Sequence, residues 1–197
     1  MLLCHMGIQK INIMNKKEKK LVLKAISLCE NTEAKKLLEE ALIVSDKMDL
    51  YKFCTPRKHL GRENLKGVYY KDGYAVATDG YVLVKLKTEY DESLEGKIIG
   101  KDGNVIKERY VNYDHIFEIE NYHDVSINWN KVLSAELYCE IAGNYYDAKK
   151  LKNIHTLFNK IYSTLDSIFS KNEDGSGFVL MKMILSDEDK RKSVDCN

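Results

Sequence analysis

Several residue types and patterns that mark particular protein classes are scarce in this chain of 197 residues. It has one proline and one tryptophan, and no glycine-rich phosphate-binding loop. No window approaches the roughly 18 apolar residues that a membrane span needs, and LVLKAISL is interrupted by Lys24. The first residues lack the basic segment, apolar core and small-residue cleavage site of a secretory signal. We therefore expect a cytoplasmic protein without a membrane partner.

Cysteines are few and scattered. The chain has five, at positions 4, 29, 54, 139 and 196, with no C-x-x-C pair. An odd number at such distances argues against a disulfide framework and against a zinc knuckle. It fits free thiols in a reducing compartment.

Sequence signatures of enzymes are also missing. The chain contains no G-x-x-x-x-G-K-[ST], G-x-S-x-G or H-E-x-x-H motif. The pairs Asp114-His115 and His123-Asp124 come nearest to a site, but neighbours on a strand point to opposite faces. A hydrolase built from scattered acids such as Asp79 and Asp114 is disfavoured, because a turn aspartate already has a backbone role. We expect no enzyme, no metal site and no cofactor.

Net charge gives no overall attraction to nucleic acid. The formal charge is +1, from 31 lysines and arginines against 30 aspartates and glutamates. Any contact with DNA phosphates must then come from local patches. The candidates are lysines near the starts of two expected helices: Lys35, Lys36, Lys149, Lys150 and Lys152. The alternative is that these lysines are ordinary solvent-facing residues.

The hydrophobic periodicity predicts an α+β fold. Apolar residues at helical spacing predict helices over 16–30 and 33–46, and from Gly67 the period switches to two. Asp-Gly pairs at 72–73, 79–80 and 102–103 predict tight hairpin turns. The architecture expected is helices packed on antiparallel meander sheets.

The second half repeats this theme. We expect a strand near 125–129, a short helix capped by Asn130, and a strand over 138–143. Asp147 then caps a helix that should extend to 161 or 162, and Asp174-Gly175 turns into a final strand. The charged segment 186–197 is predicted to be a disordered tail.

One stretch resembles a known family. GVYYKDGYAVATDGYVLVKL, residues 67–86, contains an ATDG turn after a short strand and a tight turn. This run resembles the ATDG-x-x-L element of bacterial DNA sliding clamps, the ring-shaped processivity factors of replicative polymerases. The arginine-containing loop RENLKG before it and the segment ERYVNYDHIF after it are similar to the same family, as is the helix KKLLEEALIVS.

A second match lies near the other end. FVLMKMIL, residues 178–185, resembles the methionine-rich C-terminal strand of the clamps, and YYDAKKLKNIHTLF resembles the helix that precedes it. In that family the two elements form the walls of one hydrophobic pocket that receives short linear peptides. The residues that the resemblance places in the pocket are Thr78, Gly80, Tyr81, Leu83, Val179, Met181 and Met183.

This chain departs from the family at several pocket positions. Tyr81 and Val82 stand where the clamps commonly have His-Arg. Lys182 replaces a proline and Ile184 replaces an arginine. The resemblance therefore implies a pocket whose ligand has changed or been lost.

The resemblance implies an N-terminal helical extension (1–32), two clamp-like halves (33–120 and 121–185) and the tail (186–197). It implies a binding protein, whose partners would be double-stranded DNA, peptides of replication or repair proteins, and further copies of this chain. The chain either forms a ring on DNA as a processivity factor or offers its pocket as a monomer. The alternative is a mobile-element regulatory protein that binds a protein partner without encircling DNA.

Overall fold

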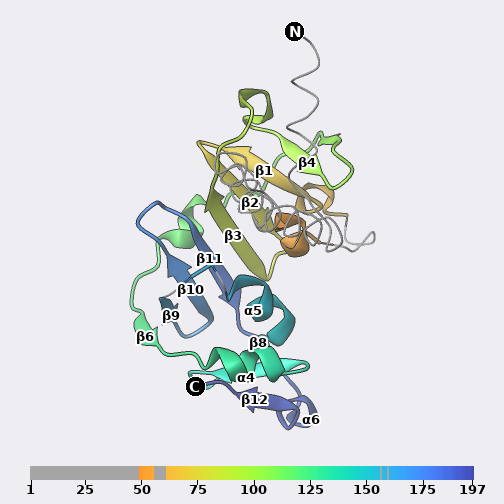
Figure 1. Ribbon diagram of the computed structural model, residues 1–197. Coiled ribbons are helices and arrows are strands. Elements are labelled where there is room, and N and C mark those ends of the chain that lie inside the picture. The colour runs from red at the N-terminus through yellow and green to blue at the C-terminus, as the bar shows by residue number, and fades with distance from the viewer. Residues whose placement is uncertain (1–48, 56–60, 156, 159) are drawn as a thin grey trace, which may run out of the picture. The chain divides into compact units, whose positions relative to one another are not determined.

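The computed structural model describes residues 49–55, 61–155, 157–158 and 160–197 (Figure 1). The chain divides into two compact units, and the second, Leu50–Asn197, holds all the elements below. The predicted helices at 16–30 and 33–46, the N-terminal extension, and Lys35 and Lys36 lie outside the described residues.

The dominant element is a nine-stranded sheet in which every neighbouring pair is antiparallel. Its strands are β1 (Gly67–Lys71), β2 (Tyr74–Thr78), β3 (Val82–Lys87), β4 (Ile98–Gly100), β5 (Val105–Ile106), β6 (His123–Val125), β9 (Ile161–Ser163), β10 (Ser167–Lys171) and β11 (Gly177–Met181). The order across the sheet is β5-β4-β1-β2-β3-β11-β10-β9-β6. The β3–β11 pair therefore joins an early block of strands to a late one.

A smaller sheet and three short helices complete the regular structure of the described residues. The sheet holds β7 (Tyr138–Ile141), β8 (Asn144–Asp147) and β12 (Ser193–Asp195); β7 and β8 are antiparallel, whereas β12 runs parallel to β7. The helices are α4 (Trp129–Ser134), α5 (Ala148–Ile154) and α6 (Asp187–Lys190). Single 3-10 turns occur at η1 (Leu50–Phe53), η2 (Glu63–Leu65), η3 (Glu92–Leu94) and η4 (Asp114–Phe117). The α+β class predicted from the sequence is confirmed.

The predicted hairpins form, but their turns differ in geometry. Asp72 and Gly73 both have positive φ, 53° and 80°, as a type I′ turn requires. At the second pair only Gly80 has positive φ, 93°. The connection there spans three residues, because the Asp79 carboxylate accepts the N–H groups of Tyr81 and Val82 and folds the turn around itself.

Helix boundaries differ from the prediction in two places. Asn128, not Asn130, caps α4 by accepting the N–H of Lys131. Asp147 caps α5 as expected, but this helix ends at Ile154 and does not reach 161. Ile161 instead begins β9, where it is buried and pairs with Val125 of β6. Tertiary pairing overrides the helical spacing of the apolar residues there.

The charged C-terminal segment is ordered, contrary to the prediction of a disordered tail. Ser186 caps α6 by accepting the N–H of Asp189, and Val194 of β12 pairs with Cys139 of β7. Lys190 and Lys192 form ion pairs with acids of the same short helix. Cys196 is fully buried, so composition alone misses an apolar residue that anchors the segment.

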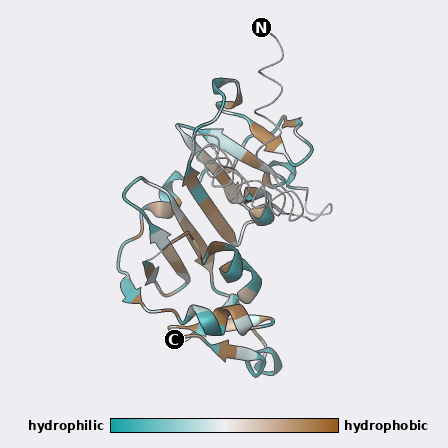
Figure 2. Ribbon diagram, in the orientation of Figure 1, coloured by the Kyte–Doolittle hydropathy of each residue, from teal (hydrophilic) through white to brown (hydrophobic). Residues whose placement is uncertain are grey.

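The core follows the central strands. Figure 2 shows hydrophobic residues along the middle strands of the large sheet. The largest fully buried side chains include Phe178 and Leu180 of β11 and Leu151 and Ile154 of α5. The apolar face of α5 is therefore part of the core, although the helix has only seven residues.

We predict that Cys196 is protected from alkylation in the native protein. Burial raises the pKa of the Cys139 thiol to about 12 and also raises the pKa of Cys196, and the thiolate is the reactive form. Iodoacetamide at pH 8 should modify Cys196 only after denaturation, as peptide mass spectrometry can measure. A cysteine introduced by Ile184→Cys, at an exposed position, should react at once. Equal rates at the two sites would contradict the ordered tail.

Candidate functional site

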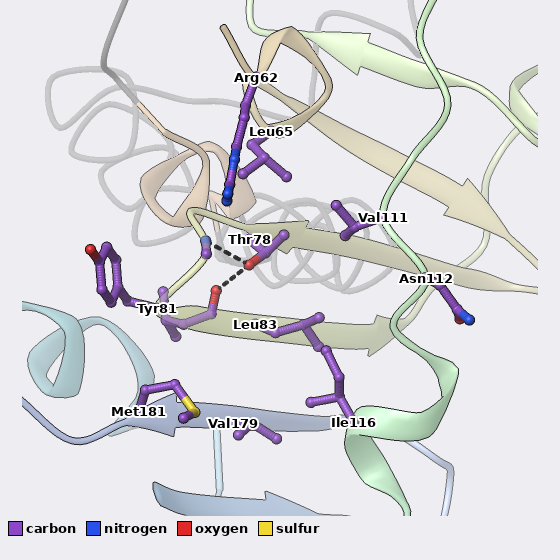
Figure 3. A pocket seen from close by; sticks show the side chains of 12 residues that line it. Arg62, Leu65, Thr78, Tyr81, Leu83, Val111, Asn112, Ile116, Val179 and Met181 are labelled. Atoms are coloured by element: carbon purple, nitrogen blue, oxygen red, sulfur yellow. Dashed lines mark hydrogen bonds between the residues drawn. The ribbon is translucent and has the colours of Figure 1, made fainter. Parts of the chain in front are cut away.

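A cavity of ≈ 280 Å³ opens over the junction of β3 and β11 (Figure 3). Its wall comes from the two strands, the turn before β3, the loop around η2 and the segment leading into η4. The lining residues are Arg62, Leu65, Thr78, Gly80, Tyr81, Val82, Leu83, Val111, Asn112, Ile116, Val179 and Met181. Most of them are apolar, and Arg62 is the one charged side chain in this set.

Six of the seven residues that the clamp resemblance placed in a pocket line this cavity. They are Thr78, Gly80, Tyr81, Leu83, Val179 and Met181. Met183 does not line it: its N–H donates to the carbonyl of Tyr145 at 2.7 Å, in an isolated bridge to β8. The chain leaves β11 at Met181, so Met183 belongs to a different part of the structure.

The strand register explains why the two motifs meet. Leu83 of β3 lies opposite Val179 of β11, and Val82 lies opposite Leu180. Because side chains alternate between the faces of a sheet, Leu83 and Val179 share one face and form the floor of the cavity. Leu180 points to the other face and enters the core.

The ATDG turn is closed by its own side chains. The Thr78 hydroxyl donates to the carbonyl of Val82 at 2.7 Å and accepts the N–H of Gly80 at 3.0 Å (Figure 3). Asp79 Oδ1 accepts the N–H groups of Tyr81 and Val82 at 2.9 and 3.0 Å. With the N–H of Asp79 donating to the carbonyl of Val82, every N–H group from Asp79 to Val82 has a partner inside the turn.

The far side of the turn is tied to β11. The N–H of Met181 donates to the carbonyl of Tyr81 at 2.9 Å. Met181 and Tyr81 stand at the mouth of the cavity, with 42% and 65% of their surface exposed. A thioether and a phenol ring at the mouth favour contact with apolar groups of varied shape.

Arg62 closes the opposite edge. Its Nη1 atom lies 3.6 Å from the position that a Cβ on Gly80 would take, and Figure 3 shows its side chain pointing toward the turn. Val111, Asn112 and Ile116 add the remaining edge. The sequence contained the segments of these residues, RENLKG and ERYVNYDHIF, but no periodicity in them shows which side chains face the cavity.

The α5 lysines occupy unequal positions. The Lys150 ammonium forms an ion pair with Asp79 Oδ2, and Lys152 donates to the carbonyl of Ala135. Lys149 is exposed. Two of the three lysines predicted on this helix to contact DNA phosphates therefore already have partners within the chain.

Other candidate groups are not assembled into sites. In the described part of the chain, no three His, Cys, Asp or Glu side chains are placed to hold a metal ion. His115 and His123 are exposed, on η4 and β6. Asp79, considered as a catalytic acid, is engaged with the backbone of its turn and with Lys150. None of the helices described is long and apolar enough to cross a membrane.

We predict that Thr78→Val lowers the free energy of unfolding by about 1 kcal/mol, because it removes the hydrogen bonds that the buried Thr78 hydroxyl makes to the carbonyl of Val82 and the N–H of Gly80. Urea denaturation measures the difference. Thr78→Ser, which keeps the hydroxyl, is the control and should lose less. If serine costs as much as valine, the methyl group and not the hydroxyl stabilises the turn.

No protein-family model matches this chain, and no curated protein matches it either. The resemblance to bacterial sliding clamps therefore rests on the short sequence motifs alone.

Proposed function

We propose that this protein is a non-enzymatic binding module whose pocket over β3 and β11 holds an apolar segment of a partner protein, as the pocket of a sliding clamp does. One observation carries the proposal. Two motifs separated by about 100 residues, ATDGYVL (77–83) and FVLM (178–181), lie on adjacent strands and line one cavity.

The size and chemistry of the cavity fit a peptide anchor. At ≈ 280 Å³ it is near the lower limit of the roughly 300–1,000 Å³ typical of small-molecule sites. That volume accommodates one or two apolar side chains of a longer segment, the rest of which would lie over Tyr81 and Met181. Burial of apolar surface, which contributes about 25 cal/mol per Å², would supply the binding free energy.

The pocket should bind the apolar residues of a clamp-type peptide and depend less than the clamps do on its acidic groups. Lys182, at the family's proline position, forms an ion pair with Asp166 at 2.7 Å and donates to the carbonyl of Leu165. Ile184, at the family's arginine position, is 97% exposed and outside the lining. The cationic side chains of the clamp pocket are thus reduced here to Arg62, which favours a mainly apolar segment with at most one acidic or carbonyl group.

A regulator that binds a protein without encircling DNA is the second candidate. A ring needs the sheet to continue from one copy to the next. The outer strands of the described nine-stranded sheet, β5 and β6, have only two and three residues. Such short edges offer few main-chain hydrogen bonds, and two α5 lysines have internal partners. Light scattering over a concentration series, with and without duplex DNA, separates the candidates: a closed multimer favours the processivity factor, and a monomer favours the regulator.

We predict that Met181→Asp weakens peptide binding at least tenfold, because a carboxylate at the mouth must be desolvated when an apolar segment enters. Fluorescence anisotropy with a labelled peptide of the type that bacterial sliding clamps bind measures the dissociation constant. Met181 is a better position than Leu83, since Leu83 is only 4% exposed and an aspartate there would destabilise the sheet.

Ile184→Asp is the matched control. It makes the same kind of change three residues away, at a fully exposed position outside the cavity, and should bind like the wild type. The proposal is wrong if the wild type binds no such peptide, or if both variants bind it equally well.

A further inference from the structure

An ion pair outside the cavity links α5 to the turn that forms the cavity mouth. Lys150 and Asp79 are 71 residues apart in the sequence. Their side chains are only 20% and 18% exposed, so solvent screens this pair less than it screens a surface pair. Neither the hydrophobic pattern nor the clamp resemblance indicated the contact.

Asp79 uses both carboxylate oxygens. Oδ1 accepts the N–H groups of Tyr81 and Val82, and Oδ2 binds the Lys150 ammonium. The carboxylate is therefore a bridge between the backbone of the turn and α5. Because its two oxygens are rigidly connected, a movement of Lys150 moves the acceptor on which the turn is folded.

Lys150 itself is firmly held. Its backbone N–H donates to Asp147 Oδ1 at 3.0 Å, the cap of α5. The neighbouring Leu151 and the helix residue Ile154 are both buried in the core. The ammonium therefore starts from a fixed helix and not from a mobile loop.

The same ammonium lies near Tyr81. Lys150 Nζ is 5.8 Å from the centroid of the Tyr81 ring, within the range of a cation–π contact. The Tyr81 backbone is held on both sides, by Asp79 Oδ1 at its N–H and by the N–H of Met181 at its carbonyl. Lys150 thus acts on Tyr81 in two ways, through the turn and directly on the ring.

We infer that Lys150 is a positioning residue for the pocket: its ion pair with Asp79 holds the turn and the Tyr81 ring where an apolar segment can bind. Lys150 is absent from the cavity lining, so its effect on binding passes through Asp79 and Tyr81. The inference rests on the proposed function, since it assigns the control of the same pocket. It also places the charge of Lys150 in pocket formation and not in contact with DNA.

The test is a double-mutant cycle on the full chain with the labelled clamp-type peptide. Its variants are Lys150→Met, Asp79→Asn and the double variant, with Lys150→Arg as the conservative replacement. Asparagine keeps an oxygen that can accept the N–H groups of the turn, so Asp79→Asn removes mainly the ion pair. Lys160→Met is the control, because Lys160 is exposed and lies away from the cavity. Its carbonyl accepts the hydroxyl of Ser170, near the end of β10, whereas Met181 pairs with Ser167 at the start of that strand.

We expect each single variant to weaken binding about tenfold and the double variant to be no weaker than either, since the two residues act as one unit. Lys150→Arg should stay within about twofold of the wild type, and Lys160→Met should not change binding. The ¹³C-methyl NMR signal of Met181, assigned through Met181→Leu, should shift in Lys150→Met without any peptide and should return in Lys150→Arg.

The inference is overturned if Lys150→Met binds like Lys160→Met, if the two single effects add, or if arginine fails to rescue. Thermal unfolding of each variant shows whether a loss reflects global unfolding. The Met181 signal needs no ligand. A shift that is rescued by arginine, in a protein that binds no peptide, would therefore support the positioning role while the proposed function failed.

Discussion

The antiparallel pairing of β3 with β11 is the constraint on which the rest of the structure depends. It aligns Leu83 with Val179 and Val82 with Leu180, and it joins the early strands β1–β5 and the later strands β6 and β9–β11 into one sheet. A shift of one residue would turn Val179 away from Leu83 and place Leu180 in the cavity. The floor of the cavity exists only in the observed register.

The pairing of β3 with β11 also fixes the position of the turn before β3. The carbonyl of Tyr81 continues the ladder by accepting the N–H of Met181, and Asp79 then reaches α5 through Lys150. The turn is thus attached to β11 and to α5, two elements that follow it by many residues. Its shape is set by hydrogen bonds within the turn, whereas its position depends on these contacts with distant elements.

Local features were predictable because their causes are local. The Asp72-Gly73 hairpin and the Asp147 cap follow from backbone preferences of those residues. The end of α5 and the folding of the C-terminal segment into α6 and β12 were not predictable from local sequence. Each depends on pairing with a distant strand, Ile161 with Val125 and Val194 with Cys139. Long-range strand pairing leaves no signature in a window of ten residues.

The candidate site divides in the same way. The pocket residues on β3 and β11 were predicted because both motifs resemble elements of the same family. They line one cavity in the structure. Arg62, Val111 and Ile116 were missed, since they lie in irregular segments with no period to show their direction. Lys150 was assigned to phosphate contact on charge alone. Its partner is a carboxylate in the turn, which no count of lysines could reveal.

Charge in and around the pocket is largely neutralised. Asp79 and Lys150 balance each other, and Lys182 is paired with Asp166. Arg62 remains as the charged group of the lining. A pocket of this kind discriminates by shape and apolar area, with one directional polar contact, and it should tolerate salt better than a site that depends on attraction between net charges.

The most direct test of the central claim is to locate a bound peptide by photo-cross-linking. A clamp-type peptide that carries a diazirine on its apolar anchor residue is irradiated with the full chain, and the modified residues are mapped by mass spectrometry. The account predicts cross-links concentrated in 62–65, 78–83, 111–116 and 179–181, the segments that line the cavity. Cross-links scattered over other surfaces, or none above the level of a scrambled peptide, would contradict it.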